Sequence, residues 1–576
     1  MRLRALLLLL LSGCGPVQAP RGPHERHEPF ADWRMGLQAG ARPTSPSATP
    51  PRFAEGEPVE SIVSPGGSFR IHFSRSGPNA VAAADADGNG VPDAVDTVAR
   101  AYDRVADFYA GLGFQRPPDD AWVGGDAGGD GRFDVYLVDF AGRADGAFRL
   151  DGCQGESTRC TGHMLEENDF AGYGYGSYEE AVATLASHEF FHAVQAAYHP
   201  GLGSVASEGT AVWASERFEP ALDDLEHFTA AYMTRPDRSL VLDPDGPAAS
   251  FSYGAGLYFQ FLGERFGDGV VRSLWEESVL APGVRWPVLV DTVLRRDWGA
   301  DFDTAFAEFA LWNLATGPRA GRVPGYARGG GYAALTVSSR TLPMDEPSVR
   351  VAAASARYFE VEGGSETVSA VFEPQVGEAP GGVHLLVAAV TANAVLRVSR
   401  VDGPGVLSAK VDAADATHVM VAVVDGRMEG TGRYGRLCIT GDASGAPCVA
   451  VQPGPDAGTD GGTDGGVGNG TDGGTDGGTP VEPRPPSEEG GCGAAPGGTS
   501  WALLAVLLAF GVRAASAQRS WAPSRSQSRT ARNRAVGAAA RRQATQSVPR
   551  GRRIERRPDS GVSTTTRPAR TAGPTR

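Results

Sequence analysis

Hydrophobic and polar positions divide the chain into a helix-rich region and a valine-rich region. Residues 67–73, Gly-Ser-Phe-Arg-Ile-His-Phe, alternate between apolar and polar side chains, which is the pattern of a half-buried strand. From there to about residue 335, apolar residues with helical spacing alternate with glycine-rich loops. This mixture predicts an α+β domain over residues 61–335.

After about residue 340 the pattern changes to short, mostly apolar segments in which valine is frequent. Glycine, proline and aspartate separate these segments, as is typical of strands joined by turns. They predict a small β-sandwich domain over residues 340–450, with strands near residues 351–359, 368–372, 384–390, 419–424 and 437–439. Such a domain would either bind substrate or protect the chain.

Residues 177–198 predict a long helix that carries two histidines on one face. Ser177 and Glu180 have the spacing of a capping box, and neither glycine nor proline follows within the segment. His188 and His192 then lie one turn apart, within reach of a single zinc ion, and Glu189 is directed beside the metal. The HExxH pattern therefore predicts two zinc ligands and a catalytic carboxylate. The alternative is a helix with two core or surface histidines.

Catalytic zinc usually has a third protein ligand and leaves its fourth position to water. Glu208 is the best candidate, because a loop with two glycines lets the chain reverse and Ser207 could cap a second helix. That helix would bring Glu208 back over the first helix. Glu216 and His199 are alternative ligands, and Glu208 could instead be an acid favoured by the helix dipole.

Four segments in this region resemble a group of secreted HExxH zinc metalloproteases of myxobacteria: HEFFHAVQ (188–195), SEGTAVW (207–213), SYGAGLYF (252–259) and ERFG (264–267). The resemblance covers about residues 68–335. It implies a zincin-like fold of the gluzincin type, a His, His, Glu zinc site and peptide hydrolysis. In the implied mechanism zinc polarises the scissile carbonyl, while Glu189 accepts a proton and passes it to the leaving amine. Tyr253 could donate to an oxyanion but is more simply a core tyrosine.

Residues 85–96, Asp-Ala-Asp-Gly-Asn-Gly-Val-Pro-Asp-Ala-Val-Asp, have the spacing of an EF-hand-like calcium loop, with aspartate in place of the usual final glutamate. A helix from residue 96 to about residue 112 is expected to follow. A structural calcium ion would be held by Asp85, Asp87, Asn89, Val91, Asp93 and Asp96; the alternative is an acidic turn without an ion. Residues 126–134 favour a second calcium site and an Asp/Gly-rich hairpin turn equally.

The N-terminus has the layout of a secretory signal, with charged residues, an apolar run over residues 5–11 and small residues. Leu-Ser-Gly-Cys at residues 11–14 resembles the bacterial lipobox, which predicts a signal peptide over residues 1–13 and a lipidated Cys14. The alternative is an ordinary signal peptide with an incidental cysteine. Residues 15–60 lack periodicity and predict a disordered tether or pro-segment.

The C-terminal part predicts a spacer, an anchor and a tail. Residues 452–489 are rich in Gly, Asp, Thr and Pro and contain too few apolar residues for a core, so they predict a solvated linker. Residues 490–514 join Gly-Gly-Cys-Gly to an apolar run and arginine, which resembles the MYXO-CTERM sorting signal of myxobacteria. The apolar run is short, which favours a cleaved anchor over a permanent membrane span. Residues 515–576 form an arginine-rich tail that is expected to be disordered and is longer than is typical of such signals.

Charge and cysteine content narrow the class of protein. Sixteen arginines against Glu555 and Asp559 give residues 513–576 a charge of +14, so the rest of the chain carries −29 of the total of −15. An acidic body argues against nucleic-acid binding by the folded part. Two short-range cysteine pairs predict disulfides in an oxidising compartment, Cys153 with Cys160 and Cys438 with Cys448.

Together these patterns predict an exported zinc metallopeptidase, secreted or at the cell surface or outer membrane. We expect a monomer that acts on protein or peptide substrates and is held to the envelope membrane by a lipid, a C-terminal anchor or both. The alternative function is that of a surface adhesion or binding protein that keeps an inactive metallopeptidase-like scaffold, and a third candidate is a metal-dependent hydrolase that acts on something other than peptides.

Overall fold

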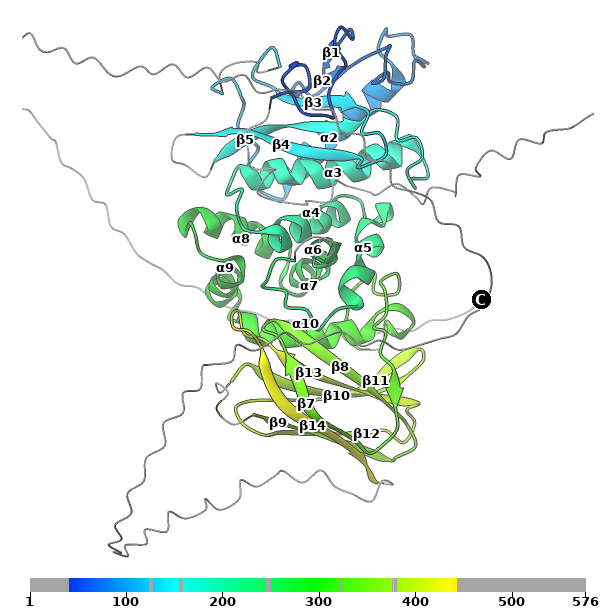
Figure 1. Ribbon diagram of the computed structural model, residues 1–576, viewed down its shortest axis with the longest axis vertical. Helices are drawn as coiled ribbons and strands as arrows, with labels where there is room; N and C mark the ends of the chain where they lie inside the picture. Colours follow the sequence, from blue (N-terminus) through cyan, green and yellow to red (C-terminus); the bar gives the residue numbers. More distant parts are fainter. Residues whose placement is uncertain are drawn as a thin grey trace, which may run out of the picture. The chain divides into compact units, whose positions relative to one another are not determined.

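The computed structural model describes residues 41–123, 128–154, 159–244, 250–321, 323–375, 377 and 381–442. Within these residues the protein combines helices and β-sheets, which confirms the α+β class (Figure 1). No helix in the described ranges is both long and apolar enough to cross a membrane. The predicted signal peptide, lipidated Cys14, linker, sorting segment and arginine-rich tail lie outside the described residues.

A five-stranded sheet forms the first layer, in the order β1-β2-β3-β5-β4. Strands β2, β3 and β5 are parallel to one another, and β1 and β4 are antiparallel edge strands. The bounds are β1 (Glu60–Val63), β2 (Phe69–Phe73), β3 (Phe133–Val138), β4 (Gly146–Cys153) and β5 (Cys160–Glu167). A disulfide joins Cys153 to Cys160 across β4 and β5, which confirms one predicted pair. Cys448, the predicted partner of Cys438, lies outside the described residues.

Residues 41–59 pack on one face of this sheet, which differs from the disordered tether or pro-segment expected over residues 15–60. Phe53 enters a small apolar cluster with Tyr136, Val138 and Leu165. Arg42 is 4% exposed and forms ion pairs with Asp120, Asp134 and Asp151. Three buried carboxylates need a positive charge. The sequence of residues 41–59 has no local pattern that predicts this contact.

Two long helices cover the opposite face of the sheet: α2 (Asp93–Gly111) and α3 (Tyr178–Ala196). Ser177 caps α3 as predicted, because its hydroxyl accepts from the Glu180 backbone N–H. The Glu180 carboxylate accepts in return from the backbone N–H of Gly176. Helix α3 contacts α2, α4, β4 and β5, and every residue from Ala181 to Ala196 is buried.

A group of shorter helices packs beneath α3. Gly203, with a φ of 93°, precedes the first of them, and a side chain there would meet the carboxylate of Asp243. Their bounds are α4 (Ser204–Phe218), α5 (Asp224–Met233), α6 (Ser250–Gly254), α7 (Gly256–Phe266), α8 (Gly269–Leu280), α9 (Trp286–Val293) and α10 (Phe302–Trp312). One-turn elements lie at Pro220–Leu222, Leu294–Trp298, Asn313–Ala315 and Gly317–Arg319.

The valine-rich region is a β-sandwich. One sheet has the order β11-β10-β13-β8-β6 and the other β12-β9-β14-β7, and apolar residues of both sheets form one core. The bounds are β6 (Ser339–Arg340), β7 (Met344–Val351), β8 (Ser355–Glu362), β9 (Thr367–Pro374), β10 (Val383–Thr391), β11 (Ala394–Asp402), β12 (Leu407–Asp412), β13 (His418–Asp425) and β14 (Arg433–Gly441).

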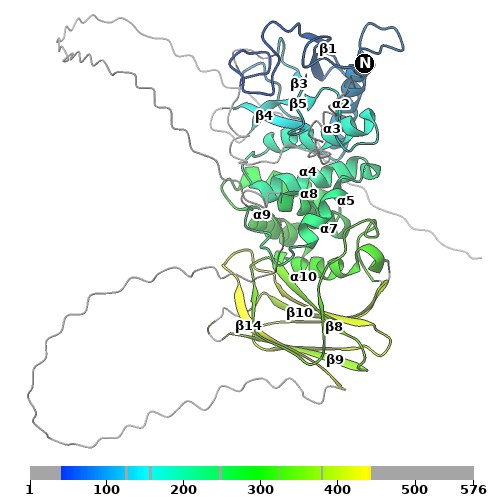
Figure 2. The same ribbon diagram turned by 45° about the vertical axis from the view of Figure 1, so that its right-hand side comes forward.

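Strands β10 and β13 are buried on both faces, which explains their nearly continuous apolar sequence. One face of their sheet belongs to the sandwich core. The other lies against the helices (Figure 2). Helix α10 contacts β13 of this sheet. The Tyr358 hydroxyl donates to the carbonyl of Ala310, 2.7 Å away, across this junction.

Candidate metal centre

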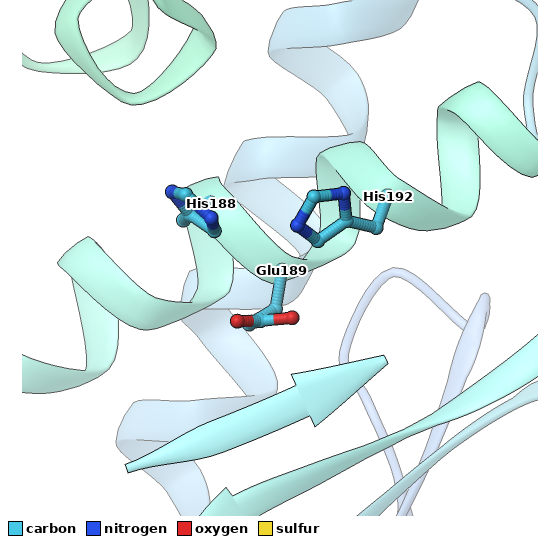
Figure 3. Close-up of side chains that lie close together, drawn as sticks. All are labelled: His188, Glu189 and His192. Atoms are coloured by element: carbon cyan, nitrogen blue, oxygen red, sulfur yellow. The ribbon is translucent and has the colours of Figure 1, made fainter. Parts of the chain in front are cut away.

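The middle of α3 carries the HExxH residues, and all three side chains are buried. His188 and His192 are one turn apart, with ring centroids separated by 5.1 Å. Glu189 is directed toward the neighbouring strand (Figure 3), where its Oε2 accepts from the Phe148 backbone N–H of β4 at 3.0 Å. One ligand atom from each of the three residues lies within 4.8 Å of the other two.

Glu208 reaches both histidines from α4. Its Oε2 lies 3.3 Å from His188 Nε2 and 3.5 Å from His192 Nε2. The helix that presents it begins at Ser204, so Ser207 does not cap it as expected, and Glu208 lies in the second turn. The reversal of the chain predicted from the glycine-containing loop therefore occurs, with the helix starting one turn earlier.

The two alternative third ligands are engaged elsewhere. Glu216 lies two turns further along α4, with its Oε1 3.7 Å from Nε of Arg328. His199 follows the end of α3 and accepts through Nδ1 from the Gly201 backbone N–H. Among the three candidates, Glu208 is the one whose carboxylate meets both histidines.

The two distances from Glu208 to the histidine nitrogens are compatible with a shared zinc ion. In a tetrahedral site with bonds of about 2.0–2.1 Å, neighbouring ligand atoms are about 3.3 Å apart. A direct imidazolium–carboxylate hydrogen bond would instead be about 2.7–2.9 Å long. The distances of 3.3 and 3.5 Å from Glu208 to the two rings match the zinc geometry better. Two imidazole nitrogens and one carboxylate are also the donors that catalytic zinc prefers.

The electrostatics of the site favour a positive charge between the rings. Burial alone would lower the pKa of His188, but Asp224 and Glu208 raise it to about 10. Burial would raise the pKa of Glu208, but His192 and His188 lower it to about 2. The buried carboxylate is therefore ionised and must be matched by protons on the rings or by a divalent metal.

Side chains around the histidines hold their rings. Asp224 of α5 places its Oδ2 3.8 Å from His188 Nδ1, and the ring of Tyr253 stacks on His188 at 5.6 Å. Gln195 lies 2.9 Å from His192 Nδ1. Gln195 could have been found from the sequence, because it lies one turn after His192 on the predicted helix. Asp224 lies on another helix, and no spacing in the sequence predicts its contact with His188.

Tyr253, considered as an oxyanion donor, lies beside the candidate ligands and is almost fully buried. Burial raises its pKa well above the usual value, and the negative charges of Glu208 and Glu189 raise it further. The phenol therefore keeps its proton at any physiological pH. It can serve as a hydrogen-bond donor at the site.

The predicted calcium loop precedes α2, which begins at Asp93 rather than at residue 96. Its carboxylates bond mainly to the loop itself. Asp85 accepts from the backbone N–H groups of Asn89 and Gly90, and Asp93 accepts from that of Ala86. The Asn89 side-chain amide donates to Asp87 and Asp96, and the Val91 backbone N–H donates to the Asn89 side-chain oxygen. Calcium binding there stays a prediction.

The second acidic segment, residues 126–134, is only partly within the described residues. Asp130 is paired with Arg70 and Arg132, and Asp134 with Arg42 and His72. These carboxylates are paired with side chains of the protein, and a calcium site at this segment stays a prediction.

Comparisons with known proteins assign neither a family nor a function to the chain. No family model and no curated protein matches the chain. Among solved structures, a 4-O-methyl-alpha-glucuronidase with specificity for decorated arabinogalactans is matched with a TM-score of 0.13 and 8% sequence identity, over 48% of this chain and 46% of that one. The chain thus spans less than half the length of that enzyme, and the likeness carries no argument about fold or function.

Proposed function

We propose that this protein is an exported zinc-dependent peptidase with a zincin-like catalytic domain. The observation that carries the proposal is the convergence of Glu208 on His188 and His192 at distances of 3.3 and 3.5 Å, with Glu189 beside them. Bound zinc would polarise the scissile carbonyl and make water a stronger nucleophile. Glu189 would accept the proton of that water and later deliver it to the leaving amine. The Phe148 backbone N–H orients the Glu189 carboxylate for this role.

The position of β4 supports a peptide as the substrate. This strand ends the order of its sheet, so in the described part of the chain no strand pairs with its outer edge. An edge strand offers backbone donors and acceptors to an extended peptide. Because Phe148 of β4 contacts Glu189, a peptide added along this edge would run beside the catalytic carboxylate.

Export is proposed from the predicted signal and lipobox. The disulfide between Cys153 and Cys160 supports it, because such bonds persist in oxidising compartments. The lipid at Cys14 and the C-terminal sorting segment are proposed as the two routes that hold the protein at the envelope.

The proposal is tested by comparing the mature protein with two variants for bound zinc and for cleavage of an unfolded protein substrate. Glu189→Gln should retain zinc and lose at least about 100-fold in kcat/KM, because the proton acceptor is removed and the ligands remain. Glu208→Ala should lose both zinc and activity. Glu179→Gln, at an exposed position in the first turn of the same helix, is the matched control and should behave as the wild type.

Equal cleavage by the wild type and Glu189→Gln would refute the mechanism. Zinc bound without cleavage of any protein substrate would refute peptidase activity, and would favour the adhesion protein or a metal-dependent hydrolase acting on other bonds.

A further inference from the structure

A buried glutamine connects the two helices that carry the candidate zinc ligands. Gln195 is 4% exposed and follows His192 by three residues on α3. Its Oε1 lies 2.9 Å from His192 Nδ1. Its Nε2 lies 2.8 Å from the carbonyl oxygen of Ser207 and 3.0 Å from Oγ1 of Thr210, both on α4. Ser207 and Thr210 flank Glu208 in the sequence, so this amide contacts the turn that presents the third ligand.

The hydrogen-bond partners fix the orientation of the amide. A carbonyl oxygen can only accept, so the atom facing Ser207 must be the NH2 group of Gln195. The Thr210 hydroxyl donates to the Ala206 carbonyl at 2.7 Å, and its oxygen therefore accepts from the same NH2 group. A flipped amide would place two oxygens against each other at Ser207. The Gln195 carbonyl consequently faces His192.

The orientation of the amide in turn determines which nitrogen of His192 carries the proton. Because the Gln195 Oε1 accepts, His192 Nδ1 must donate. A neutral imidazole then has its lone pair on Nε2, the nitrogen that lies 3.5 Å from Glu208. This is the tautomer that a zinc ligand at that position requires.

We propose that Gln195 is a positioning residue of the zinc site, which holds His192 in the Nε2-ligating tautomer and ties it to the turn of α4 that carries Glu208. This inference rests on the proposed function. One neutral side chain thus fixes the tautomer of His192 and contacts the turn that positions Glu208. The contact with His188 differs, because it comes from a carboxylate, Asp224, on another helix.

The test is the zinc dissociation constant of the mature protein, measured with zinc alone by competition with a chromophoric chelator. Gln195→Met keeps the length of the side chain and removes its hydrogen bonds. It should raise the dissociation constant about 10–100-fold, the usual effect of losing such a partner. Gln260→Met is the matched control, because Gln260 is equally buried on α7 and bonds to Glu264. That variant should bind zinc as the wild type does.

Two further variants separate positioning from general stability. Gln195→Glu can still accept from His192 Nδ1 but cannot donate to α4, so it should recover part of the affinity that Gln195→Met loses. A role limited to packing the two helices predicts no such recovery. Thr210→Val removes one contact to α4 and leaves that to His192, so it should weaken zinc binding only a few-fold. Selective ¹⁵N labelling of histidine should show a protonated Nδ1 at His192 in the zinc-loaded wild type.

The outcomes distinguish this inference from the proposed function. If the wild type binds zinc and cleaves protein while Gln195→Met binds zinc equally tightly, the inference is wrong and the function stands. If Gln195→Met does not fold, unchanged affinity in both Gln195→Glu and Thr210→Val would overturn the inference. If the wild type binds no zinc, the proposed function falls, and the inference with it.

Discussion

Glu166 of β5 is a buried acid that the proposed reaction does not use. It is fully buried on the side of the sheet that faces α2 and α3, near Tyr102. Burial raises the pKa of Glu166 to about 8, and the negative charge of Asp145 raises it further, although the nearby Tyr102 hydroxyl opposes the rise. At neutral pH the folded protein therefore keeps a proton that the unfolded chain releases.

This difference predicts a pH-dependent stability. The folded-state pKa lies above the unfolded value, so the folded protein is destabilised as pH rises from about 4.5 to about 8, by roughly 3 kcal/mol on reaching pH 7. Glu166→Gln cannot ionise and should lose less stability over this range than the wild type. Chemical denaturation at pH 5, 6, 7 and 8 measures the effect, with Glu179→Gln as an exposed control. Parallel curves for the wild type and Glu166→Gln would contradict it.

The ion pairs of Arg42 hold the segment of residues 41–59 on the domain. The Arg42 guanidinium forms ion pairs with Asp120, Asp134 and Asp151, whose side chains are at most 4% exposed. Removing one partner of a buried ion pair leaves the other charges uncompensated. We expect Arg42→Met to lower the free energy of unfolding by about 3–5 kcal/mol.

The matched control is Arg52→Met in the same segment, where the side chain donates at the surface to the carbonyl of Pro46. It should change stability by less than about 1 kcal/mol. Comparable losses in the two variants, measured by urea denaturation, would mean that the charge of Arg42 is not what holds the segment.

At the scale of elements, local sequence patterns predict individual helices and the ligands near them, but they do not predict contacts between residues far apart in the chain. The cap and the composition of the segment predict the helix that carries His188 and His192. A chain reversal within twenty residues predicts that Glu208 returns to this helix. The ion pairs of Arg42 join residues about 80 to 110 positions apart. Asp224 reaches His188 only because α5 packs against α4. No pattern of spacing predicts such contacts, since they depend on how elements pack.

At the scale of the whole described unit, His384 links the sandwich to the helices. Its Nδ1 lies 2.7 Å from Asp402, and its Nε2 lies 2.9 Å from Asp303 of α10. Burial would lower the pKa of His384 and Arg400 opposes protonation, but Asp303 and Asp402 raise the pKa above its usual value. The protonated ring can donate to both carboxylates.

A raised histidine pKa contributes stability that is complete below the unfolded pKa of about 6.5 and is lost as pH rises through the folded value. We therefore expect His384→Gln to cost more stability at pH 6 than at pH 8.5. Thermal unfolding of the wild type and the variant at both pH values measures this. His418→Gln, at a less buried position of the same sheet, should show no such trend. An equal cost of His384→Gln at both pH values would show that the link does not depend on the proton.

The double burial of β10 and β13 limits how the protein can be divided. Tyr358, Leu386 and Met420 of the sandwich share one apolar core with the residues of α10. A gene fragment that stops near residue 340, the boundary between the two sequence patterns, would leave that side of the helices bare and invite aggregation. Recombinant work should keep residues 41–442 together, and a homologue that had lost the sandwich would need polar substitutions on α10.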